Sequence, residues 1–65
     1  MRKVTKDEFY KEIFDKKLNV HPYYPGHTPP STAFFNFPNG DEWGRSVPIT
    51  NKYGRVIDYE WFIAD

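Results

Sequence analysis

The chain has 65 residues, of which thirteen are aromatic, nine basic and nine acidic, and none is cysteine. A chain of this length forms one domain with a small core, which no disulfide or cysteine-bound zinc can stabilise here. The net charge of zero argues against a general nucleic-acid binder, which usually carries a basic excess, and no apolar run approaches the roughly 18 residues of a membrane span. The N-terminal residues also lack the apolar stretch of a signal peptide. We therefore expect a single cytoplasmic domain over residues 1–65 with no membrane contact.

The aromatic content of 20% has two explanations. Each aromatic ring buries roughly 150–250 Å², so a few large rings can build the core of a very short chain. Exposed aromatic rings are also enriched at the energetic centres of protein interfaces. The placement of the rings along the predicted elements decides between the two.

A helix is predicted over residues 5–18. Thr5 and Glu8 have the spacing of a capping box, and Val4 and Phe9 have the spacing of a hydrophobic staple around it. Apolar side chains then recur at helical intervals and predict one stripe that packs against the rest of the domain. The stripe consists of Phe9, Tyr10, Ile13, Phe14 and Leu18.

Residues 19–31 hold four prolines within nine positions and no charged residue. Proline lacks an N–H donor and disfavours helical geometry in the residue before it, so we expect an irregular or polyproline-like crossover. The segment carries the chain's two histidines, His21 and His27. Zinc sites need three or four ligands at defined spacings, and no Cys, Asp or Glu lies in this segment, so we expect neither a metal nor a cofactor.

Three strands are predicted over residues 32–37, 42–50 and 55–63, separated by turns at Asn39-Gly40 and at residues 51–54. The expected fold class is α+β, with the N-terminal helix packed on a three-stranded antiparallel β-meander. Pro48 suits an edge strand or a bulge better than the middle of a sheet. Alternation predicts that one set of side chains faces the helix. This set is Ala33, Phe35, Phe37, Trp43, Val47, Ile49, Ile57, Tyr59, Trp61 and Ile63, with Val56, Asp58, Glu60 and Phe62 on the other face.

No motif for catalysis is present. Ser31 and Ser46 lie outside any Gly-x-Ser-x-Gly sequence, and no glycine-rich phosphate loop occurs. Asp58 and Glu60 would share a strand face, which is typical of a solvated surface as well as of a carboxylate pair. We expect no catalytic residue and no enzymatic activity.

Five aromatic side chains are left over from the predicted core and are the candidates for binding a partner. They are Phe34, Phe62, Tyr23, Tyr24 and Tyr53. Their types favour a protein partner or a homodimer. Weak single-stranded nucleic-acid binding through the sheet is the alternative, since Arg45 and Arg55 lie near the strands, although Asp58 and Glu60 on the same face would repel phosphate.

The stretches KVTKDEFY at residues 3–10 and NVHP at residues 19–22 resemble small uncharacterised proteins encoded by phages and prophages. In those proteins a short helix precedes an x-V-x-P step and then strands with a glycine-rich turn. The resemblance covers residues 3–22 and carries no established activity or site residue. It implies a phage accessory protein that binds a host protein.

Overall fold

The computed structural model of the protein describes residues 1–26 and 30–64. These residues form one helix and a five-stranded sheet, in which every neighbouring pair of strands is antiparallel. The elements follow the order β1 (Arg2–Val4), α1 (Lys6–Asp15), β2 (His21–Tyr23), β3 (Ala33–Asn36), β4 (Glu42–Thr50) and β5 (Val56–Ile63). The α+β class is therefore as predicted, but the three-stranded meander is wrong, because the sheet has five strands in the order β1-β5-β4-β3-β2.

The two strands that the sequence pattern did not predict form the two edges of the sheet. β1 has three residues, too few for an alternating pattern, and it pairs with β5. β2 lies within the predicted irregular crossover, where Pro22 pairs with Phe35 of β3. An edge strand tolerates proline because the missing N–H has no neighbour to bond on its outer side.

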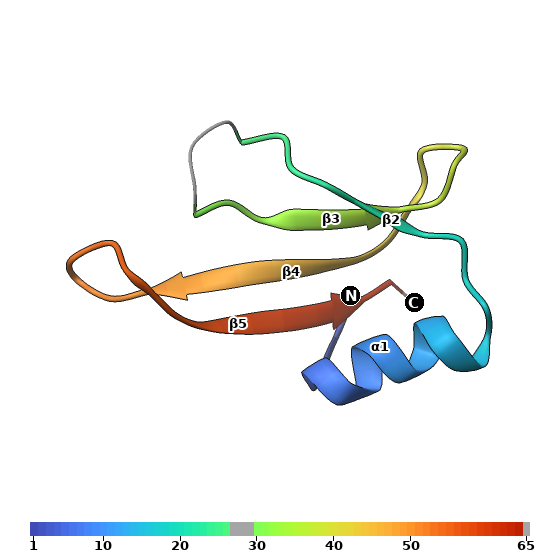
Figure 1. Ribbon diagram of the computed structural model, residues 1–65, viewed down its shortest axis with the longest axis horizontal. Helices are drawn as coiled ribbons and strands as arrows, with labels where there is room; N and C mark the ends of the chain where they lie inside the picture. Colours follow the sequence, from blue (N-terminus) through green and yellow to red (C-terminus); the bar gives the residue numbers. More distant parts are fainter. Residues whose placement is uncertain (27–29, 65) are drawn as a thin grey trace.

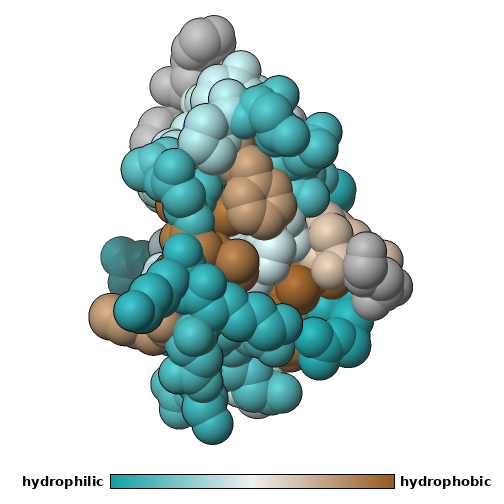
Figure 2. Space-filling model, turned by 90° about the vertical axis from the view of Figure 1, so that its right-hand side faces the viewer, coloured by the Kyte–Doolittle hydropathy of each residue, from teal (hydrophilic) through white to brown (hydrophobic). Residues whose placement is uncertain are grey.

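The helix covers only part of this sheet. Figure 1 shows α1 beside β5, close to the end of β5, while the β4–β5 hairpin extends well beyond the helix. Seen from the right-hand side of that view, apolar atoms remain visible between hydrophilic side chains (Figure 2). Several apolar side chains around the core are accordingly only partly buried, namely Ile13, Leu18, Val20, Phe37 and Trp61.

The N-terminus of α1 contains the predicted capping box. The Glu8 N–H donates to Thr5 Oγ1, and the Thr5 N–H donates to Glu8 Oε1, both at 3.1 Å. The hydrogen bond from the Thr5 backbone N–H, and after it one from the Thr5 side chain, favours the charged carboxylate and lowers the pKa of Glu8 below its usual value of 4.5. The stabilisation from this carboxylate is therefore present above pH 4.5 and is lost as the pH falls through the lowered pKa.

The C-terminus of α1 is a Schellman motif, and it ends the helix at Asp15 rather than at the predicted residue 18. The Leu18 N–H donates to the Ile13 carbonyl at 3.0 Å, and the Lys17 N–H donates to the Phe14 carbonyl at 3.3 Å. Lys17 has a φ of 49°, in the left-handed region that usually holds glycine. Leu18 keeps the helical spacing of apolar residues but lies beyond this turn, which is why the pattern predicted too long a helix.

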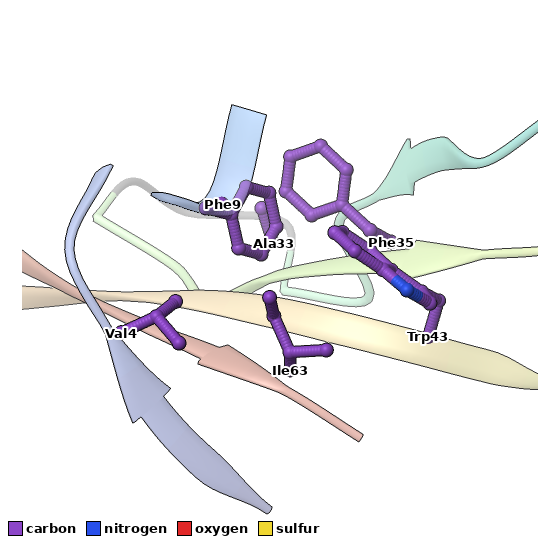
Figure 3. Packing of buried hydrophobic residues seen from close by; sticks show 6 residues of the cluster. All are labelled: Val4, Phe9, Ala33, Phe35, Trp43 and Ile63. Atoms are coloured by element: carbon purple, nitrogen blue, oxygen red, sulfur yellow. The ribbon is translucent and has the colours of Figure 1, made fainter. Parts of the chain in front are cut away.

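Phe9 is the centre of the core. It is fully buried, and its ring centroid lies 4.9 Å from those of Phe35, Trp43 and Trp61. Figure 3 shows Phe9 reaching from the helix toward the strand residues of the cluster. A Cβ on Gly44 would lie 3.0 Å from Phe9 Cε2 and 2.6 Å from the Phe62 carbonyl oxygen. Glycine is therefore the residue that lets the ring approach the sheet so closely.

A β-bulge turns Trp43 toward this core. Phe35 pairs with Gly44 and Asn36 pairs with Glu42, so Trp43 is an extra residue between the two pairs. The shift by one position places Val47 and Ile49 on the face opposite to the helix, where they pair with Glu60 and Asp58. The prediction that Val47 and Ile49 share a face with Trp43 is wrong for this reason.

A second bulge lies near the other end of β4. Ile49 pairs with Asp58 and Thr50 pairs with Val56, so Ile57 is left without a partner and is 62% exposed. The core assignment of Ile57 is therefore wrong. The core assignments of Phe14, Tyr10 and Tyr59 are also wrong, since these three side chains are exposed.

Pro48 lies in β4, the central strand of the sheet, which the sequence rule disfavoured. Its neighbour Tyr59 of β5 pairs with it on one side. On the other side, β3 begins at Ala33 opposite Ser46, so no described strand residue pairs with Pro48 there. The proline therefore occupies a local edge within a central strand, where its missing N–H costs no ladder hydrogen bond.

Replacing Phe9 by alanine should cost about 3–5 kcal/mol of unfolding free energy, which is comparable with the whole stability of so small a domain. Thermal unfolding followed by near-ultraviolet circular dichroism measures the effect. Phe14→Ala is the matched control on the same helix, because Phe14 is 80% exposed, and it should change the free energy by less than about 0.5 kcal/mol. Equal losses in the two variants would contradict the described packing.

Replacing Lys17 by glycine should stabilise the protein by about 0.5–1 kcal/mol, because glycine adopts the left-handed conformation without steric cost. The gain should appear as a higher urea midpoint with an unchanged slope. Lys16→Gly is the control, since Lys16 has a φ of −96°, and it should not stabilise the protein. A gain from Lys16→Gly equal to that from Lys17→Gly would refute the conformational explanation.

Candidate functional site

An aromatic-lined cleft opens on the helix side of the sheet, in the part that α1 leaves uncovered. Its volume is about 590 Å³, within the range of small-ligand and peptide sites. One wall is a continuous row of rings, in which Trp61 lies 5.4 Å from Tyr10 and 6.2 Å from Tyr59 between ring centroids. The described residues that line the cleft are Tyr10, Tyr24, Gly26, Pro30, Ser31, Ala33, Phe35, Ser46, Pro48, Val56, Tyr59 and Trp61.

The floor of the cleft consists of small side chains. Ala33 and Ser46 pair across β3 and β4, and Ser46 pairs in turn with Trp61 of β5. Ser46 is 6% exposed and is the one buried polar residue in the described part of the chain. Because Ala33 and Ser46 are small and the aromatic side chains around them are large, the surface is concave at this point.

The lining is polar only through neutral groups. None of the described residues that line the cleft carries a charge, although 28% of the chain is charged. The hydroxyls of Tyr10, Tyr24 and Tyr59 make no hydrogen bond to any other described residue. The described lining residues can therefore offer hydrogen-bond donors and apolar ring surface to a ligand, but no counter-ion.

The five aromatic residues predicted to bind a partner do not lie together. Tyr24 lines the cleft. Tyr53 lies in the turn between β4 and β5 and is 80% exposed. Tyr23, Phe34 and Phe62 lie on the opposite, outer face of the sheet.

On that outer face the strand register forms one row across all five strands. Tyr23, Phe34, Arg45, Phe62 and Lys3 are successive cross-strand partners from β2 to β1. The Arg45 guanidinium lies 5.1 Å from the centroid of the Phe34 ring. We call this set the outer row.

Both cations of the outer row are bonded to carboxylates. Arg45 donates to both carboxylate oxygens of Glu42, at 2.8 and 2.9 Å, and this hydrogen bonding raises the pKa of Arg45. Lys3 Nζ lies 3.0 Å from Glu60 Oε2. The outer row therefore presents rings beside neutralised charges rather than a positive surface.

Sequence reasoning missed Tyr10, Tyr59 and Trp61 as site residues, because it assigned all three to the interior. One sequence signal could have corrected this assignment. A helix of ten residues spans about 15 Å, whereas a strand of nine residues spans about 30 Å. A single helix of that length cannot cover the whole sheet face.

Only His21 of the two histidines belongs to the described part of the chain. His21 Nε2 lies 2.9 Å from Asn19 Oδ1 on the surface, and His27 lies outside the described residues. Within residues 1–26 and 30–64, no three His, Cys, Asp or Glu side chains come close enough together to hold a metal ion. The same residues include no helix long and apolar enough to span a membrane.

Comparison with known proteins finds no matching protein family, no similar curated protein and no similar solved structure.

The two tryptophans should differ in their access to solvent, because Trp61 lines the cleft while Trp43 is 8% exposed in the core. Trp43→Phe leaves Trp61 as the fluorophore, and Trp61→Phe leaves Trp43. Acrylamide should quench the first variant several times more strongly than the second. Equal quenching would mean that the cleft is closed in solution.

Proposed function

We propose that this protein is a small non-enzymatic domain that binds another protein through the aromatic cleft. The observation that carries the proposal is the gathering of exposed rings around one concavity. Scattered apolar residues are ordinary on a protein surface, whereas grouped Tyr and Trp side chains are typical of the energetic centres of interfaces. In the described structure, Tyr10, Tyr24 and Tyr59 are exposed in this way.

The chemistry of the lining supports binding rather than catalysis. The described lining residues include hydroxyl groups but no carboxylate, imidazole or ammonium group. A serine or tyrosine oxygen needs a neighbouring general base to act as a nucleophile. The resemblance of residues 3–22 to phage-encoded proteins supports a host protein as the partner.

Self-association through the outer row is a second candidate. Tyr23 is 58% exposed, and the rings of Phe34 and Phe62 are partly exposed beside it. Two copies could cover these rings face to face, since Arg45 and Lys3 already have intramolecular counter-ions. Single-stranded nucleic acid is less well supported on this face, because phosphate would have to displace Glu42 or Glu60.

Affinity capture tests the proposal: the tagged protein retains binding partners from a bacterial lysate. The wild type is compared with variants of the cleft and of the outer row. Tyr24→Ala and Tyr59→Ala alter the cleft, Phe34→Ser alters the outer row, and Tyr53→Ala is the exposed control. We expect the two cleft variants to lose a protein that the wild type, Phe34→Ser and Tyr53→Ala retain. Melting temperatures close to that of the wild type would show that the variants are folded.

Light scattering at high concentration completes this test. If Phe34→Ser alone changes the mass of the particle, the outer row is the functional surface and the cleft proposal is wrong. If no variant changes either retention or mass, the protein is not a binding domain of the proposed kind.

A further inference from the structure

We infer that the cleft binds a neutral, proline-containing peptide segment in the polyproline II conformation. This inference rests on the proposed function and names the ligand class of the same cleft. Three properties of the lining carry it: its charge, its hydrogen-bonding groups and the open side of β4.

The charge of the lining selects an uncharged occupant. The described lining residues carry no charge, in a chain that has eighteen charged residues among 65. A Lys, Arg, Asp or Glu side chain entering the cleft would lose hydration without gaining a counter-ion. A neutral segment avoids this cost.

The hydrogen-bonding groups favour a ligand with free carbonyl oxygens. The hydroxyls of Tyr10, Tyr24 and Tyr59 and the indole N–H of Trp61 make no hydrogen bond within the described residues. A polyproline II segment has no internal hydrogen bonds, so its carbonyls remain free to accept, and its proline residues have no N–H that needs an acceptor. Aromatic-lined grooves with such donors are a recurrent way to bind these segments.

The open side of β4 argues against the main alternative, an added β-strand. No described strand residue pairs with Pro48 on the side facing away from β5. An incoming strand would lack one ladder hydrogen bond there, because proline has no N–H. Two of the chain's own prolines, Pro30 and Pro48, line the cleft and add to its apolar surface.

The test is a titration of ¹⁵N-labelled protein with a blocked oligoproline decapeptide, followed by nuclear magnetic resonance. The chain has two tryptophans, and each gives one indole N–H signal. The Trp61 signal should shift on binding, while the signal of the buried Trp43 serves as an internal control and should stay in place. Tyr59→Ala and Tyr24→Ala should each weaken binding at least about tenfold, and Tyr53→Ala should leave it unchanged.

Three further probes decide the specificity. A blocked glycine–serine decapeptide, an oligoproline with two prolines replaced by glutamate, and a thymidine oligonucleotide should each bind at least about tenfold more weakly than oligoproline. No Trp61 shift with oligoproline would overturn the inference, as would equal binding of the glycine–serine peptide or tighter binding of the oligonucleotide.

The outcomes separate this inference from the proposed function. If a protein partner depends on Tyr24 and Tyr59 but oligoproline leaves the Trp61 signal unmoved, the proposed function stands and the ligand class is wrong. If oligoproline binds in the cleft while no protein depends on it, the ligand class stands and the proposed function is wrong.

Discussion

The contact between Phe9 and Gly44 determines how the helix and the sheet fit together. The Phe9 ring rests where a side chain on Gly44 would collide with it, and other aromatic rings surround it on the sheet side. A helix of ten residues is marginal by itself in water, so it depends on such packing. Because this anchor lies near one end of β4, the helix covers that end and leaves the rest of the sheet face open. The cleft lies over the part of the sheet face that the helix does not cover.

Local rules predicted the parts of the fold that depend on a few neighbouring residues. The capping box at Thr5 and the strand over residues 42–50 are present in the structure as expected. The edge strands and the bulges were not predicted, since β1 pairs with a strand at the other end of the chain, β2 lies in a proline-rich segment, and each bulge depends on the register of two paired strands. A bulge moves every later side chain of its strand to the other face, and for this reason the core assignment of Val47 failed. The core assignment of Ile57 failed because Ile57 is itself the unpaired residue of a bulge.

The candidate site was predictable only in part, because the exposure of an aromatic side chain depends on how far its covering element reaches. Alternation correctly placed Tyr59, Trp61 and Ile63 on the helix side of the sheet. It could not show that only Ile63 of these is fully covered. Tyr23 and Tyr24 were both among the residues predicted to bind a partner, but adjacent residues of an extended chain point to opposite faces. One of them therefore belongs to the outer row and the other to the cleft.

The pairing of β1 with β5 has a kinetic consequence. Lys3 pairs with Phe62, 59 positions later in the chain, so this pair closes a loop that contains almost the whole polypeptide. Closing a loop of that length costs chain entropy. The contacts between β1 and β5 offset this cost only when the other strands are already in place. Tyr10 and Trp61 are likewise 51 positions apart, so their ring contact forms only when the two ends of the chain come together. The cleft is a property of the fully folded chain, so any ligand that fills it stabilises the native state over every partly folded one by mass action.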